Sequence, residues 1–236
     1  DDLSGIIPKD LPRQWVDPEG KWAAFSLRAR VIVYNTNLVK PEDAPRSLRD
    51  LVLPKWRGKV AIANPLFGTT AAHVSALFIA MGDDAAKAWL QALRANEARM
   101  VEGNSTVRDL VARGEALVGL TDTDDVFSGI ADGKPIDLVL PDQDGLGTLA
   151  IPNSVFIVKG GPHPEPARRL AAWLMGPALE EFFAANSARQ IPVRDNVPRP
   201  KDLQRLAGLK AMDVDYALVA ERMPGVAQMA RDILGR

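Results

Sequence analysis

The stretch that decides the fold is ALVGLTDTDD, residues 116–125. An apolar run typical of a buried strand ends at Leu120, and two hydroxyls and three carboxylates follow it. A helix-like stretch then begins at Val126. Because ligands bind in the loops after the carboxyl ends of strands in open α/β sheets, we predict that this polar loop is a ligand site.

The polar residues of this loop are Thr121, Asp122, Thr123, Asp124 and Asp125. Three carboxylates this close in sequence repel one another unless a cation, an array of hydrogen-bond donors or bulk water stabilises them. A helix N-cap is the alternative interpretation, since Asp and Thr are good caps and acids suit the positive end of the helix dipole. One acid is enough for a cap, so the whole group favours a ligand, with Asp124 and Asp125 as candidate metal ligands.

Strands alternate with helices along the rest of the chain. Besides the strand before the acidic loop, we predict strands at residues 29–34, 59–63, 99–102, 137–140 and 154–159. Helices are predicted at residues 69–81, 84–96, 105–113, 164–175 and 177–186. Ser105 is the expected N-cap of the third helix, residues 1–27 are expected to be irregular, and residues 213–236 should form two helices broken at Pro224-Gly225. This alternation indicates an α/β fold with mostly parallel sheets.

The composition excludes several classes of protein and site. The 236 residues suffice for one large domain or two small ones, and hydrophobic residues make up 47% of them, as in globular proteins. A net charge of −1 gives no indication of nucleic acid or an anionic membrane surface as partner. The absence of cysteine rules out disulfides, zinc–thiolate sites and cysteine nucleophiles.

A second candidate loop, NPLFGTT at residues 64–70, also lies between a predicted strand and a predicted helix. We therefore expect Thr69 and Asp122 to lie on loops at the carboxyl ends of neighbouring strands. Gly68 lets the backbone approach a ligand closely, and Thr69 and Thr70 stand where the free N–H groups of a helix point, which suits an anion. An ordinary threonine N-cap explains the same residues equally well, so the two interpretations stay open.

Two arginines and two histidines are weaker candidates. Arg28 and Arg30 bracket the start of the first strand, where strand alternation places both on one face. They become ligand candidates only if that strand borders a cleft, and two solvated arginines at a strand edge are the commoner case. A lone histidine on a helix, as predicted for His73, is more often packed than functional, and neither it nor His163 has a partner at metal-ligand spacing.

The order of these pieces resembles the periplasmic solute-binding proteins of bacterial ABC importers. The most similar branch is that of the ferric-ion-binding proteins and their thiamine- and aminoethylphosphonate-binding relatives. The resemblance rests on residues 28–36, 51–64, 104–121, 144–159 and 187–192. It covers essentially the whole chain, and the phrase PKWRGKV at residues 54–60 is fairly specific to the group.

The resemblance implies two α/β lobes joined by crossing strands, with the ligand in the cleft between them. It assigns residues 1–33 and 147–186 to the first lobe, residues 37–142 to the second, and residues 187–236 to C-terminal helices that pack on the second lobe and the hinge. Relatives usually begin with a further β-α-β-α segment that this sequence does not show. We therefore expect an incomplete first lobe with an unpaired sheet edge, which leads to a homodimer, to strand exchange or to low stability.

The resemblance also bears on the ligand. Iron-binding members carry two adjacent tyrosines at the positions that align with Asp124 and Asp125, and a further tyrosine of some members aligns with Phe67. This sequence therefore lacks the phenolates that give those sites their ferric affinity. The implied ligand is a ferric or other metal ion with a synergistic anion, or a small zwitterion such as an aminophosphonate. The implied ligand-binding residues are Arg28, Phe67, Gly68, Thr69, Thr70, Thr121, Asp122, Asp124 and Asp125.

The implied function is that of a binding protein rather than an enzyme. It would be periplasmic, or lipid-anchored outside the cytoplasmic membrane, and would deliver its ligand to an ABC permease in the inner membrane. No cofactor is required, and a metal ion would enter as the ligand itself. Two alternatives remain open: a metal-dependent α/β enzyme that uses Asp122, Asp124 and Asp125 with His73 as base, and a fragment without ligand competence.

Overall fold

The chain folds into two compact units in a computed structural model that describes residues 1–235. Unit 1 contains residues 1–28 and 151–207, and unit 2 contains residues 29–150 and 208–236. The chain therefore passes between the units three times, twice within strands: β1 (Ala23–Asn35) and β6 (Ala150–Val155). The unit boundaries differ from the lobe boundaries implied by the resemblance chiefly in residues 187–207, which belong to unit 1.

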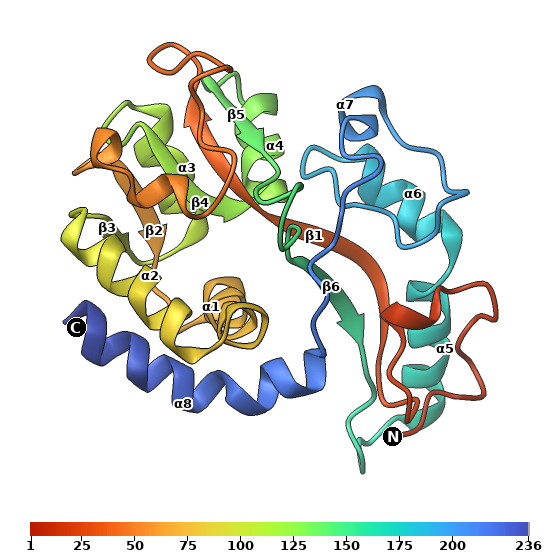
Figure 1. Ribbon diagram of the computed structural model, residues 1–236. Coiled ribbons are helices and arrows are strands. Elements are labelled where there is room, and N and C mark those ends of the chain that lie inside the picture. Colours follow the sequence, from red (N-terminus) through yellow and green to blue (C-terminus); the bar gives the residue numbers. More distant parts are fainter. Residues whose placement is uncertain (236) are drawn as a thin grey trace. The chain divides into compact units, whose positions relative to one another are not determined.

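The sheet of unit 2 is mostly parallel, as predicted. Its strands are β2 (Val60–Ala63), β3 (Arg99–Val101), β4 (Val118–Asp122) and β5 (Ile136–Val139), in the order β3-β2-β4-β1-β5 (Figure 1). β2 is parallel to β3 and β4, whereas β1 is antiparallel to β4 and β5. Strands β2 to β5 thus run in one direction, and only β1 runs against them in this order; β6 also pairs with β1.

Five helices accompany this sheet: α1 (Gly68–Met81), α2 (Asp83–Ala95), α3 (Asn104–Ala112), α4 (Thr123–Ala131) and α8 (Tyr216–Leu234). Helix α1 follows β2 along the chain, α3 follows β3, and α4 follows β4. Helix α8 packs against α1 and α2. Two short 3₁₀ turns, η2 (Asp50–Val52) and η3 (Pro54–Trp56), precede β2. The strand-then-helix order brings three helix N-termini to the carboxyl edge of three neighbouring strands.

The packing of α3 on β4 depends on a glycine. A Cβ atom at Gly119 would stand 2.5 Å from Cγ1 of Val107 and 2.9 Å from the carbonyl oxygen of Ala61. No larger residue fits there without moving the helix or the neighbouring strand. The small residue in the middle of ALVGL therefore lets α3 lie close against the strand that leads into the acidic loop.

Unit 1 is held together around a buried ion pair. It contains η1 (Arg13–Trp15), α5 (Pro164–Leu174), α6 (Pro177–Ala185) and α7 (Lys201–Gln204). Arg194 pairs with Glu180 of α6 and with Asp10 near the N-terminus. Leu27 and Ile191 exchange backbone hydrogen bonds of 2.7 and 2.8 Å. These long-range contacts tie residues 191–194 to the rest of unit 1.

Five sequence predictions are corrected in detail. Strand β1 begins at Ala23 rather than Ala29, so residues 23–27 are not irregular. Helix α4 begins at Thr123 rather than Val126, and α3 begins at Asn104, so Ser105 lies inside its first turn rather than at the N-cap. Strand β6 spans residues 150–155 instead of 154–159. The predicted break at Pro224 is absent: α8 continues through it, because packing against α1 and α2 and the Asp215 cap outweigh the one missing N–H donor.

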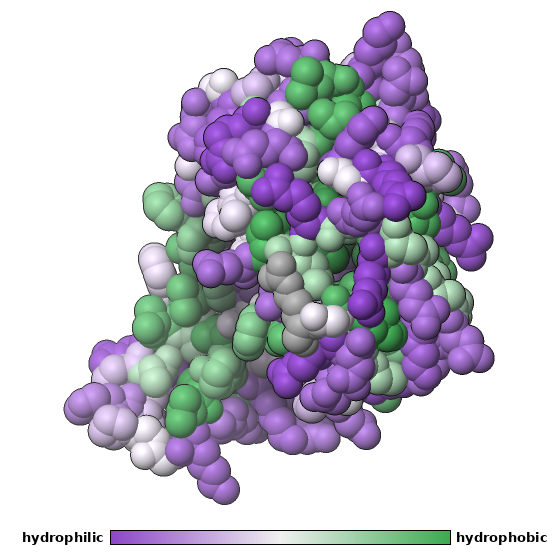
Figure 2. Space-filling view, turned by 90° about the vertical axis from the view of Figure 1, so that its left-hand side faces the viewer, coloured by the Kyte–Doolittle hydropathy of each residue, from purple (hydrophilic) through white to green (hydrophobic). Residues whose placement is uncertain are grey.

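The surface of the described residues is of mixed polarity. The face in Figure 2 has hydrophobic groups lying between hydrophilic ones. The exposed large hydrophobic side chains of unit 2 include those of Leu38, Phe67 and Leu146. Within residues 1–235, no helix has both the length and the apolar character that crossing a membrane requires.

Candidate functional site

The candidate site forms where β3, β2 and β4 end. Helices α3, α1 and α4 start there, and none of the three has a side-chain hydrogen bond at its N-cap. The hydroxyl of Thr69, in the first turn of α1, donates to Oδ2 of Asp122, the last residue of β4, over 2.7 Å. The loop of residues 64–70 and the acidic loop therefore meet at the ends of neighbouring strands, and this prediction is confirmed.

Asp122 binds an arginine of the protein itself. Its Oδ1 accepts from Nη1 of Arg30 at 2.7 Å, while Oδ2 accepts from Thr69 and from Nδ2 of Asn104 at 2.9 Å. The pair is closed off from solvent, with Arg30 0% and Asp122 1% exposed. The antiparallel register of β1 and β4 places Arg30 directly opposite Asp122. The expectation of two solvated arginines is wrong for Arg30.

Arg30 donates hydrogen bonds to several other polar residues of the site. Its Nη1 also donates to Thr69 and to Asn104, each at 3.1 Å. Its Nε donates to Nδ1 of His73 at 3.4 Å. Burial, followed by the nearby Arg30 cation, lowers the pKa of His73 well below its usual range, so this histidine is neutral at pH 7. His73 is therefore a packed hydrogen-bond acceptor, as a lone helical histidine usually is.

Asp124 and Asp125 lie in the first turn of α4, directly after Asp122 and Thr123, and both are half-buried. One carboxylate oxygen from each of Asp122, Asp124 and Asp125 lies within 4.8 Å of the others. We call these three residues the acidic cluster. Burial, and then the charges of Asp124 and Asp122, raise the pKa of Asp125 to about 6. Arg30 pairs with Asp122, and a cation bound among the three carboxylates would stabilise their clustered negative charge.

The hydroxyls near the cluster are already hydrogen-bonded. Thr121 donates to the carbonyl oxygen of Asn104 at 3.1 Å and to Oδ2 of Asp125 at 3.2 Å. Thr70 is buried, and its hydroxyl lies 3.4 Å from both Arg30 and Asn104. Thr123 accepts from the amide of Ala29 at 3.1 Å. An anion at α1 would therefore meet the backbone amides of its first turn rather than free threonine hydroxyls.

Three predicted residues remain: Phe67, Gly68 and Arg28. Phe67 precedes α1 with 69% of its surface exposed, and Gly68 begins the helix with φ at 58°. Arg28 belongs to unit 1, where it donates to Oδ1 of Asn153 through Nε and Nη2. Asn104 is the residue that sequence analysis missed. Its only signal was its place at the start of a helix after a strand, the same place that Thr69 and Asp124 hold.

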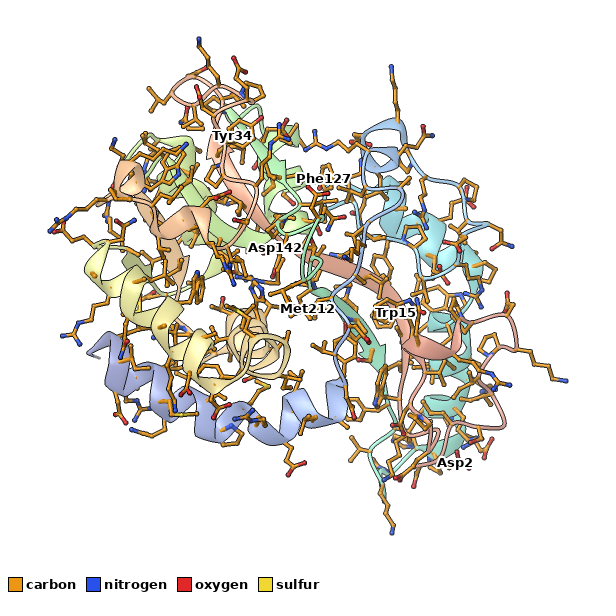
Figure 3. All side chains as sticks on the ribbon, in the orientation of Figure 1. Asp2, Trp15, Tyr34, Phe127, Asp142 and Met212 are labelled. Atoms are coloured by element: carbon orange, nitrogen blue, oxygen red, sulfur yellow. The ribbon has the colours of Figure 1, made fainter. Side chains whose placement is uncertain are left out.

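The two tyrosines of the chain lie elsewhere. Tyr34 is buried in β1, where it pairs with Val118 and Asp137 (Figure 3). Tyr216 begins α8 and donates its hydroxyl to the carbonyl oxygen of Ala150. Burial raises the pKa of Tyr216 above its usual range, which keeps it a neutral donor. The oxygen ligands that the cluster itself offers to a metal are thus carboxylates, not phenolates.

Comparison with known families decides the affiliation. Residues 6–219 match the sequence profile of the family described as "Bacterial extracellular solute-binding protein". The chain belongs to this family. This solute-binding protein is 31% identical over 219 residues to "Iron uptake protein A1" of Synechocystis, an alignment that covers 88% of this chain and 60% of the relative. It is 28% identical to the "Fe(3+)-binding periplasmic protein" of Serratia marcescens, covering 86% and 61% of the two chains.

Solved structures share the fold of this solute-binding protein. The open conformation of ferric iron-binding protein A from Mannheimia haemolytica superposes with a TM-score of 0.83 at 20% identity, covering 97% of this chain and 74% of that one. The predicted periplasmic-binding-protein-like fold is thereby confirmed. The chain spans about 60% of the length of the two curated relatives.

A pH-dependent stability follows from the raised pKa of Asp125. The folded state holds the Asp125 proton up to about pH 6, whereas the unfolded chain releases it near the ordinary value of 3.8. Asp125 therefore contributes stability below about pH 4 that is lost as the pH rises through about 6. Asp125→Asn should be more stable than wild type by about 1–2 kcal/mol at pH 7.5, after allowance for partial exposure, and equal to it at pH 4.

Urea unfolding of both proteins across this pH range measures the effect. Asp84→Asn is the control, because Asp84 is an exposed acid in the first turn of α2 and should give no such pH-dependent difference. A stability difference for Asp125→Asn that is the same at both pH values would contradict the raised pKa.

Proposed function

We propose that this chain is the solute-binding part of an ABC importer, working outside the cytoplasmic membrane in the periplasm and delivering its ligand to a membrane permease. Family membership over residues 6–219 is the observation that carries this role. The two curated relatives are named for iron uptake and for binding Fe(3+). The ligand we infer is a ferric ion accompanied by a small anion.

The acidic cluster supplies the cation-binding side of this proposal. Asp124 and Asp125 carry hard carboxylate oxygens, the ligand type that suits a ferric ion in the absence of phenolates. Asp122 is already paired with Arg30, so its role is to hold the starts of α1 and α4 together. Because the cation replaces the proton that Asp125 holds up to about pH 6, binding should weaken as the pH falls below that value.

The N-terminus of α1 supplies the anion-binding side. Its N-cap, Phe67, makes no side-chain capping bond, so the first-turn amides point outward without a side-chain acceptor. The helix dipole and these amides favour a carboxylate, carbonate or phosphate oxygen. An anion there would lie at the same sheet edge as Asp124 and Asp125 and could complete the coordination of the cation.

The enzyme alternative is less well supported by the geometry. Its proposed base, His73, is 1% exposed and accepts a hydrogen bond from the Arg30 cation. A neutral, buried imidazole whose pKa is lowered by burial and by Arg30 is a poor general base for a substrate at the acidic cluster. A binding role requires nothing of His73 beyond this packing.

Replacing both half-buried acids of the cluster, Asp124 and Asp125, tests the function. Asp124→Asn combined with Asp125→Asn should abolish the binding of ferric citrate measured by isothermal titration calorimetry, because no carboxylate outside the Arg30 pair remains in the cluster. Calcium and 2-aminoethylphosphonate are titrated in parallel, since a zwitterion would also need the carboxylates. If the protein binds 2-aminoethylphosphonate more tightly than ferric citrate, the cargo is an aminophosphonate and not iron.

A matched control lies in the same unit. Asp83 and Asp84 are two adjacent acids in the first turn of α2, just as Asp124 and Asp125 are in α4. Asp83→Asn with Asp84→Asn removes the same charge from the same helix position and should leave binding unchanged. Equal binding by wild type and by the Asp124/Asp125 double variant would show that these acids only complement the helix dipole.

A further inference from the structure

A second cavity in unit 2 is lined by none of the residues of the acidic cluster. It has a volume of about 460 Å³, which falls within the range of small-molecule sites. It lies between the loop that joins β5 to β6, the end of α1 and the start of α2. Its apolar lining is formed by Leu48, Ala80, Met81, Ala85, Trp89 and Leu146.

The apolar wall is built around Trp89, whose one polar group already has a hydrogen-bond acceptor. Trp89 is 6% exposed, and its indole N–H donates to the carbonyl oxygen of Leu48 at 2.9 Å. This hydrogen bond holds the ring in place, and the indole N–H therefore needs no acceptor from a ligand. Leu146, on the opposite loop, keeps 37% of its surface exposed. An apolar group of moderate size would be desolvated between these two side chains.

Two opposite charges, Arg49 and Asp142, line the same cavity and attract each other without forming a hydrogen-bonded ion pair within residues 1–235. Arg49 is exposed, and among residues 1–235 its guanidinium makes no hydrogen bond or ion pair. Asp142 is half-buried with φ at 58°, and its carboxylate accepts from the amide of Leu48 at 3.2 Å. Within the described chain Asp142 also takes part in no ion pair. Burial raises its pKa, an effect that an added cation would oppose.

We propose that this cavity binds a small zwitterion with an apolar side chain, the chemistry of an apolar α-amino acid. The ligand carboxylate binds Arg49, the ammonium group binds Asp142, and the side chain packs against Trp89 and Leu146. Each charged group of the ligand then meets a protein charge of opposite sign that forms no ion pair within residues 1–235, and the apolar group meets an apolar wall. This site goes beyond the cation site proposed above, because Asp124 and Asp125 take no part in it.

The test is a calorimetric titration of the full chain with L-phenylalanine and L-leucine. Three probes each remove one feature: 3-phenylpropanoate lacks the ammonium group, phenethylamine lacks the carboxylate, and glycine lacks the side chain. We expect each of them to bind at least about tenfold more weakly than phenylalanine. Arg49→Gln and Asp142→Asn should each weaken phenylalanine binding by a similar factor, and Ala85→Trp should abolish it by filling the cavity.

The variants are chosen so that they fold. Asn tolerates a positive φ, which keeps the backbone of Asp142→Asn unstrained, and Arg49 is on the surface. Arg46→Gln is the matched control, because Arg46 is exposed three residues away and lines the neighbouring cavity instead. It should bind phenylalanine like wild type, as should the Asp124/Asp125 double variant. Absence of amino-acid binding up to about 10 mM, or equal binding by wild type and Arg49→Gln, would overturn the proposal.

Discussion

Arg30→Met should destabilise the protein by about 3–5 kcal/mol, because it leaves the buried Asp122 carboxylate without its cation. Arg30 is the only positively charged side chain bonded to that carboxylate within residues 1–235, and neither partner reaches solvent. Thr69 and Asn104 donate to the other oxygen but cannot balance the charge. Urea unfolding at pH 7.5 gives the change in the free energy of unfolding.

A double-mutant cycle separates the pair from its surroundings. Asp122→Leu alone should also be strongly destabilising, because it leaves the Arg30 cation buried, whereas Arg30→Met with Asp122→Leu should recover part of the loss. Recovery stays incomplete because Thr69 and Asn104 lose both the Asp122 acceptor and the Arg30 donor. If Arg30→Met changes the stability by less than about 1 kcal/mol, the pair is solvated and the description of this site as buried is wrong.

Glu180→Ala should have an effect of similar size in unit 1, about 3–5 kcal/mol. Glu180 is 0% exposed, accepts from the amide of Arg194 at 2.9 Å and forms an ion pair with its guanidinium. Removing it leaves the Arg194 cation, which is 2% exposed, without its buried partner and paired only with the exposed Asp10 among residues 1–235. The same urea unfolding experiment measures the loss, with the fluorescence of the unit 1 residues Trp15, Trp22 and Trp173 as one of its signals.

The other acid of this cluster provides the contrast. Asp10 also pairs with Arg194, at 2.7 Å, but 61% of its side chain is exposed. Exposed ion pairs contribute about 0–1 kcal/mol, so Asp10→Ala should cost far less than Glu180→Ala. Equal losses for the two variants would mean that burial does not govern the strength of these ion pairs.

Sequence by itself determined the local elements and the position of the acidic loop. The apolar period of residues 69–81 predicted α1, which spans Gly68–Met81, and the run that ends at Leu120 predicted the strand before the acids. These predictions succeed because helix and strand periods arise from neighbouring residues alone. The meeting of Thr69 with Asp122 also followed from sequence, since parallel strands end at the same edge of a sheet.

Only the tertiary structure decided what the acids contact. Strand β1 enters the sheet antiparallel between β4 and β5, and that register alone places Arg30 opposite Asp122. No local pattern in ARVIVY distinguishes a buried, paired arginine from a solvated one, because burial depends on strands that are distant in the sequence. The same holds for α8, where packing on α1 and α2 overrides the local preference of Pro224 to end a helix. Local periods specify elements, whereas strand partners and helix packing specify which charges are buried together.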